Sequence, residues 1–274
     1  MTFAEKYGPW ALVAGGSDGV GAAFAEGLAE RGLNVALLAR RQALLDEVAA
    51  GIVERTGMQT RALAIDLAAA DAAARIVDAT SDLDVGFLVY CAGADPDFKP
   101  FLTNSIESAE AMVRRNCTVL VQLCHHFARG MVDRGSGGIV VFGSGAGLAG
   151  GPNMAAYAAT KAFDMVFAEA LWSELHDKGV DVLGLILGKT NTPALRQLEY
   201  ERGLLSSPDE APPDADAIET VIADAFDNLT NGPTVFVGDM MRAAAQVMGS
   251  MTRNQAVQMV IAASAAAMGP DAGD

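Results

Sequence analysis

The sequence of 274 residues predicts an α/β fold, a doubly wound parallel sheet of about seven strands with helices on both faces. Two observations predict it. Short apolar runs alternate with amphipathic stretches almost to the end of the chain, and each intervening stretch is long enough to form a crossover helix. The runs are apolar at consecutive positions rather than at every second one, which is typical of strands that are buried on both faces.

The expected strands are bounded by Gly, Asp or Asn and occupy residues 10–14, 34–39, 60–65, 85–90, 138–143, 180–187 and 234–238. Helical patterns lie between them, near residues 20–31, 41–56, 70–80, 106–134 and 154–178. No interior linker is long or biased enough to separate two domains. We therefore expect one domain over residues 1–274.

Residues 204–217 are rich in Pro and Asp and form the one marked change in composition. We interpret them as the end of a surface excursion, at about 189–217, that provides the substrate loop. A loop of this length in a compact domain is usually a lid or a mobile segment. The chain then extends beyond the last strand over about 240–274, where it could cover the pocket or a neighbouring subunit.

The formal net charge of −15 argues against nucleic acids and anionic membranes as partners, because both require a basic face. The N-terminus lacks the features of a signal peptide, and the late apolar stretch at 256–269 is shorter than the roughly 20 residues of a spanning helix. Three cysteines without a signal peptide indicate a cytoplasmic protein without a disulfide framework. No metal site is expected, because the C-x2-C and H-x3-H spacings are absent.

The segment at 13–24, VAGGSDGVGAAF, fits two signatures. GGSDG is a literal G-x-S-x-G, which in α/β hydrolases presents a serine nucleophile, here Ser17. That interpretation requires a histidine on a later loop, yet His125, His126 and His176 fall within, or near the end of, predicted helices. Ser17 also follows the first strand, where a dinucleotide fold has its phosphate-binding turn. A serine hydrolase is kept as a remote alternative.

The second signature is a glycine turn, G-x3-G-x-G, between a strand and a helix. Glycines there allow a tight turn and close approach of the backbone to a pyrophosphate, whose charge meets the free N–H groups at the helix N-terminus. We therefore expect a Rossmann-type dinucleotide site, the alternative being a tight turn without a ligand. The cofactor-binding residues expected in this turn are Gly15, Ser17, Asp18, Gly19, Val20 and Gly21.

Four polar residues follow in a specific order. Tyr157 and Lys161 in YAATK lie four residues apart, hence on one face of a helix. Ser144 ends a strand thirteen residues before the tyrosine, and Asn116 lies within a predicted helix. In this order the chain resembles the short-chain dehydrogenase/reductase family, from residue 10 to about residue 238. The resemblance further includes Asp66 and Leu67, CAG at Cys91, Ala92 and Gly93, and LGKTNT with Leu187, Gly188, Thr190 and Thr192, all expected to contact the cofactor.

The resemblance implies hydride transfer between a nicotinamide dinucleotide and a carbonyl or alcohol carbon. Tyr157 is then the general acid in reduction and the general base in oxidation. A free phenol has a pKa of about 10, so the ammonium of Lys161 and the oxidised nicotinamide are needed to stabilise the phenolate. Ser144 is implied to hydrogen bond to the carbonyl oxygen. Lys161 is also implied to bind the nicotinamide ribose, and Asn116 to position a water that links Lys161 to solvent.

The end of the second strand, LLARR, bears on the choice of cofactor. Ala39 provides no carboxylate to bind the adenine-ribose hydroxyls, as NAD enzymes usually do. Arg40 and Arg41 instead carry guanidinium groups that suit a 2′-phosphate. NADP(H) is therefore favoured over NAD(H). Asp18 argues against this, because some NADP enzymes carry a basic residue in the glycine turn.

Three positions depart from the family pattern: Ala14 replaces a threonine, Cys91 an asparagine and Leu187 a proline. We interpret the first two as an apolar repacking beneath the site, because losing both polar partners together costs less than losing one. Leu187 removes a rigid turn before the substrate loop, so the path of that loop is less fixed.

The segments expected to line the substrate pocket, at 94–101, 145–154 and 191–205, offer Phe, Leu and Met but no dense cationic cluster. They favour a mostly apolar ketone or aldehyde and the corresponding alcohol, without fixing its identity or the physiological direction. A non-catalytic dinucleotide-binding sensor or scaffold is the alternative, and the complete set of four polar residues argues against it.

The helical stretches at 119–132 and 155–175 are apolar over more than one face. One face of each covers the sheet, so the surplus needs a second partner. We therefore expect a homo-oligomer, with a tetramer favoured over a dimer.

Overall fold

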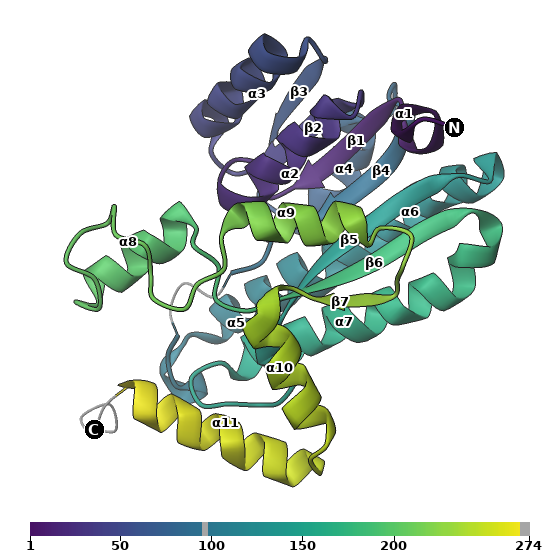
Figure 1. Ribbon diagram of the computed structural model, residues 1–274. Coiled ribbons are helices and arrows are strands. Elements are labelled where there is room, and N and C mark those ends of the chain that lie inside the picture. Colours follow the sequence, from purple (N-terminus) through teal and green to yellow (C-terminus); the bar gives the residue numbers. More distant parts are fainter. Residues whose placement is uncertain (95–97, 269–274) are drawn as a thin grey trace.

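The computed structural model describes residues 1–94 and 98–268 and contains one parallel sheet, in the order β3-β2-β1-β4-β5-β6-β7 (Figure 1). The strands are β1 (Trp10–Ala14), β2 (Asn34–Ala39), β3 (Thr60–Ala64), β4 (Val85–Tyr90), β5 (Gly137–Ser144), β6 (Val180–Leu187) and β7 (Thr234–Phe236). Helices flank the sheet on both sides, which confirms the predicted doubly wound α/β class.

The described residues form eleven α-helices: α1 (Phe3–Tyr7), α2 (Gly19–Glu30), α3 (Gln42–Thr56), α4 (Ala72–Ala79), α5 (Ile106–Val113), α6 (Val119–Arg134), α7 (Ala155–Leu175), α8 (Pro193–Glu201), α9 (Ile218–Asp227), α10 (Gly238–Gly249) and α11 (Arg253–Met268). None of the described helices is both long and apolar enough to cross a membrane. No group of three or more His, Cys, Asp or Glu in this part of the chain could hold a metal ion.

The consecutive apolar residues of the strands face two separate core layers. Along β1, Leu12 belongs to the layer beneath α4, α6 and α7, while Val13 belongs to the layer beneath α2, α3 and α9, and both are fully buried. This double burial explains why the strands lack the polar–apolar alternation of a half-exposed sheet.

The winding of the sheet reverses at β1, which pairs with β2 on one side and with β4 on the other. Crossover connections leave these two neighbours in opposite directions, which opens a crevice at the carboxyl ends of β1 and β4. Ligands of doubly wound sheets bind in such a crevice.

The helix predicted near 106–134 is wrong in one respect, because α5 and α6 are joined by a π turn at Arg114–Thr118. In this turn the N–H of Val119 donates to the carbonyl of Arg114, five residues back, rather than four. No Gly or Pro interrupts residues 114–118, so a continuous helix was predicted there.

The excursion at about 189–217 is more regular than a long loop, because it contains α8. Thr192 caps this helix by accepting a hydrogen bond from the N–H of Leu195, and Pro193 occupies its first turn. The two ends meet where Asp216 N–H donates to the carbonyl of Lys189 and Asn191 N–H donates to that of Asp216, both at 2.9 Å. The segment therefore leaves and rejoins the fold beside the carboxyl end of β6.

Candidate active site

A cavity of about 560 Å³ lies at the carboxyl ends of the central strands. It brings together residues from the ends of β1, β2, β4, β5 and β6, together with Tyr157 and Lys161 of α7. All the expected cofactor residues line it: Gly15, Ser17, Asp18, Gly19, Val20, Gly21, Arg40, Arg41, Asp66, Leu67, Cys91, Ala92, Gly93, Tyr157, Lys161, Leu187, Gly188, Thr190 and Thr192. Ser144 lines it as well, whereas Asn116 does not.

The glycine turn fits a pyrophosphate because it leaves room where side chains would otherwise be. Gly15 has a φ of 92°, which favours glycine, and a Cβ atom there would lie 3.0 Å from the backbone nitrogen of Ala92. A Cβ atom at Gly21 would lie only 2.1 Å from the carbonyl oxygen of Gly15. The chain can therefore turn sharply into α2 and present its backbone to the cavity.

Two side chains at the end of the cavity near β2 and the glycine turn carry opposite charges. Arg41 Nη2 lies 3.9 Å from Asp18 Oδ2, and both side chains are exposed by more than a third. Asp18 also accepts a hydrogen bond from the N–H of Gly19 at 2.7 Å, capping α2. The carboxylate thus holds the turn and pairs loosely with Arg41, so it competes with any anion for that guanidinium.

Ser144 and Tyr157 lie on neighbouring elements at the other end of the cavity. Ser144 is the last residue of β5, and its hydroxyl accepts a hydrogen bond from the N–H of Ala146 at 3.2 Å. Tyr157 lies in the first turn of α7. The strand end and the helix therefore present a hydroxyl and a phenol to the same space.

Lys161 is buried one turn further along α7. Its Nζ donates to the carbonyl of Phe142 at 2.8 Å and to Asp164 Oδ2 at 2.9 Å, and it lies 6.0 Å from the centroid of the Tyr157 ring. Burial raises the pKa of Asp164, and the ammonium of Lys161 opposes that shift. The sequence interpretation did not identify Asp164, although it lies seven residues after Tyr157 and so on the same helical face.

Asn116 lies in the π turn, fully buried behind the cavity wall. Its Nδ2 donates to Thr160 Oγ1 at 2.9 Å, and its Oδ1 accepts from Arg115 Nε at 3.2 Å. A Cβ atom at Gly93 would come within 2.6 Å of Asn116 Oδ1, so the two residues are packed closely. In this structure Asn116 ties α7 to the turn after β4, and the predicted water link to Lys161 stays a prediction.

The residues that depart from the family pattern pack among apolar neighbours. Ala14 is fully buried in the layer beneath α6, while Cys91 and Leu187 pack against the opposite layer. Burial raises the pKa of the Cys91 thiol to about 12, so it remains neutral near physiological pH. The backbone link survives, because Cys91 N–H donates to the carbonyl of Ala14 at 2.9 Å.

The alternative use of Ser17 as a nucleophile lacks a partner in the described residues. Ser17 lines the cavity, but none of the three histidines does. His125 and His126 are exposed on α6, and His176 follows α7. The geometry therefore does not support a serine hydrolase triad.

The chain is similar to known proteins in both sequence and structure. A family model described as short chain dehydrogenase matches residues 9–203. The chain is 35% identical over 263 residues to a 7beta-hydroxysteroid dehydrogenase of Clostridium sardiniense, an alignment that covers 94% of this chain and 96% of that protein. A solved 7beta-hydroxysteroid dehydrogenase structure has a TM-score of 0.85 and 29% identity, covering 95% of this chain and 99% of that one.

A short-chain dehydrogenase from Sphingobium yanoikuyae, solved in complex with NADPH, has a TM-score of 0.73 and 27% identity. That alignment covers 89% of this chain and 96% of the other. The family match, the shared sheet and the position of the site at the ends of its strands all lead to the same assignment. The chain therefore belongs to the short-chain dehydrogenase family and is an oxidoreductase that acts on CH–OH and carbonyl groups.

Proposed function

We propose that the protein interconverts a mostly apolar ketone and the corresponding secondary alcohol with NADP(H), using Tyr157 as the general acid and base. The observation that carries this proposal is the single cavity into which the glycine turn, the two arginines, Ser144, Tyr157 and Lys161 all open. A bound nicotinamide supplies the hydride in reduction and accepts it in oxidation.

The side chains of this protein account for the proton. In reduction, the Tyr157 hydroxyl donates its proton to the carbonyl oxygen of the substrate as that oxygen gains negative charge. Ser144 donates a hydrogen bond to the same oxygen and orients it. The Lys161 ammonium, 6.0 Å from the phenol ring, stabilises the phenolate that remains. In oxidation the phenolate takes the proton back.

Support for NADP(H) over NAD(H) comes from Arg40 and Arg41, which line the cavity where β2 ends. Guanidinium groups bind phosphate through charge-assisted hydrogen bonds. The relative from Sphingobium yanoikuyae binds NADPH, which supports the same choice here. Asp18 weakens this preference, because it lies 3.9 Å from Arg41 and competes with the phosphate for the guanidinium. It does not replace the acid at the end of β2 that would bind the ribose hydroxyls in an NAD enzyme.

We further propose a bulky, ring-containing substrate such as a hydroxysteroid. The relatives named 7beta-hydroxysteroid dehydrogenases support this class. In this chain α11 closes against the loop at 145–154: Arg253 donates to the carbonyl of Leu148, and a Cβ atom at Gly151 would lie 2.7 Å from Val260 Cγ1. We infer that the helix and the loop border the substrate on the side of the cavity where Tyr157 lies.

The test is consumption of NADPH, followed by absorbance, with a panel of steroid ketones, simple aliphatic ketones and aldehydes. We expect faster turnover of the steroid ketones, and slower turnover when NADH replaces NADPH. Dinucleotide binding without turnover of any carbonyl would instead indicate a sensor. Equal rates for all ketones would contradict the proposed substrate class.

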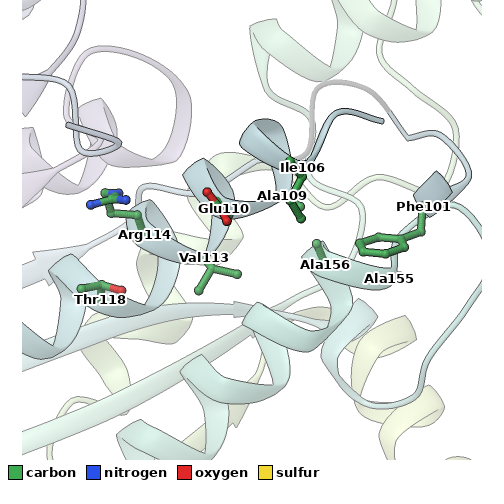
Figure 2. Close-up of a pocket in the computed structure, with 9 residues that line it drawn as sticks. All are labelled: Phe101, Ile106, Ala109, Glu110, Val113, Arg114, Thr118, Ala155 and Ala156. Carbon is green, nitrogen blue, oxygen red and sulfur yellow. The ribbon is translucent and has the colours of Figure 1, made fainter. Parts of the chain in front are cut away.

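We also propose that the protein is a homo-oligomer, with a tetramer favoured. An apolar groove of about 680 Å³ lies between α5 and the start of α7 (Figure 2). Val113 on α5 and Val166 on α7 are 46% and 57% exposed, which is more apolar surface than a monomer needs there. A second copy of the chain would cover these helices. Light scattering tests this, and a single species near 28.3 kDa would contradict it.

A further inference from the structure

A buried ion pair lies beside the proposed proton donor. Lys161 and Asp164 are joined at 2.9 Å, and their side chains are only 4% and 2% exposed. Tyr157, Lys161 and Asp164 occupy positions i, i+4 and i+7 of α7, so all three lie on one helical face. Their order along the face is phenol, ammonium, carboxylate.

The carboxylate restrains the ammonium. Of the three N–H donors of Lys161, one is held by Asp164 and one by the carbonyl of Phe142 at 2.8 Å. Asp164 Oδ2 accepts from Lys161, while Asp164 Oδ1 is buried with no hydrogen-bond partner among the described residues. A half-satisfied buried carboxylate is costly, which suggests that it does more than fill space.

The groups around this pair are neutral near physiological pH. The titratable groups that interact with Asp164 lie on three elements: Tyr90 on β4, Cys117 in the π turn and Cys124 on α6, while Cys91 interacts with Lys161. Burial raises the pKa of each of them, that of Cys117 to about 11. Lys161 is thus the charged group in contact with Asp164 in the described part of the chain.

We propose that Asp164 is a positioning residue that sets the pH range in which Tyr157 works, by holding Lys161 in place and offsetting part of its charge. A cation beside a phenol stabilises the phenolate, and an anion on the far side of that cation weakens the effect. Without Asp164, Tyr157 would ionise at lower pH. This inference rests on the proposed function, in which Tyr157 exchanges the proton.

The test is Asp164→Asn, which keeps an acceptor oxygen for Lys161 but removes the charge. The ionisation of Tyr157 is read in the protein without cofactor, as the tyrosinate absorbance that is lost when Tyr157→Phe is made in the same background. We expect it to move down by about one pH unit. Asp164→Glu, which restores the charge, should return the titration toward the wild-type value.

A matched control is Asp82→Asn, which breaks the exposed pair with Arg61 and should leave the titration unchanged. If Asp164→Asn does not fold, Asp164→Gln also keeps an acceptor oxygen for Lys161 while removing the charge, and predicts the same downward shift. An unchanged titration, or an upward one, would overturn the inference.

The pH profile of alcohol oxidation gives the second measurement. Its rising limb should move down with the absorbance titration. If the titration shifts but no carbonyl or alcohol is turned over, the proposed function fails and the electrostatic role of Asp164 stands. If turnover is normal and neither measurement shifts, the role of Asp164 alone fails.

Discussion

The two ends of the cavity are built in different ways. At the nucleotide end the shape depends on the backbone, because a single Cβ atom at Gly21 would collide with the carbonyl of Gly15. At the other end the lining comes from segments far apart in the sequence, since Ser144 follows β5, Tyr157 lies on α7 and Leu195 lies on α8. We therefore expect binding of the dinucleotide to depend on local features of the chain, and the choice of substrate to depend on long-range ones.

Replacing the residue where the two ends meet tests whether they act independently. Tyr157→Phe removes the proton but keeps the ring, so turnover should fall by a factor of about 10² to 10⁴. NADPH affinity, measured by the fluorescence of the bound cofactor, should stay at the wild-type value. Turnover at the wild-type rate would show that another group donates the proton, and a parallel loss of affinity would show that the ends are coupled.

A change confined to the nucleotide end should leave the substrate end unaffected. Arg40→Asp with Arg41→Ala removes charge-assisted hydrogen bonds worth about 1.5–3 kcal/mol, so NADPH affinity should fall by roughly 10- to 150-fold relative to NADH. The KM for the ketone should not change. Arg75→Ala, an exposed cation on α4, is the control. An unchanged ratio of the two cofactor affinities would mean that these arginines only face solvent.

Because the backbone shapes the nucleotide end, we expect that adding a single methyl group to a glycine there destabilises the fold. Gly21→Ala should lower the free energy of unfolding by about 1–3 kcal/mol, because the new Cβ atom would lie 2.1 Å from a carbonyl oxygen. Gly130→Ala is matched to it, as another helical glycine whose Cβ atom would meet nothing closer than 3.9 Å. It should gain about 0.5–1 kcal/mol. Urea unfolding of both variants measures the difference, and similar values would argue against a backbone constraint.

The smallest effect is expected at the substrate end. Arg253→Ala removes the hydrogen bond from α11 to the carbonyl of Leu148, worth about 0.5–1.5 kcal/mol. The KM for a bulky ketone should rise by roughly 2- to 10-fold, while NADPH affinity is retained. Asn254→Ala, one residue along and exposed, should change neither constant. A loss of NADPH affinity in Arg253→Ala would show that α11 also shapes the nucleotide end.

The strand and the glycine turn beside the cavity were visible in the sequence for a physical reason. Buried parallel strands need consecutive apolar residues, and a turn without space for Cβ atoms needs glycines, so both requirements are visible within short stretches such as 10–21. Tyr157 and Lys161 are visible for a similar reason, because one helical turn separates them.

Other features depend on distant neighbours and were not predicted. Asp164 looks like an ordinary helix residue until the burial of its partner Lys161 is known. Asn116 was predicted to position a water near Lys161, whereas its hydrogen bond to Thr160 could not be predicted from the sequence. The helices α1, α8, α9, α10 and α11 lie outside the helical stretches that were predicted.

The π turn at Arg114–Thr118 makes this part of the chain sensitive to insertions and deletions. Removing one residue would restore a regular helix and rotate α5 by about 100° relative to α6. The residues of α5 that line the groove with α7 would then face a different direction, and Asn116 would no longer pack against Gly93. A deletion scan should therefore find that one lost codon here is far more harmful than one in the irregular segment at 204–217, which has no helical phase to keep.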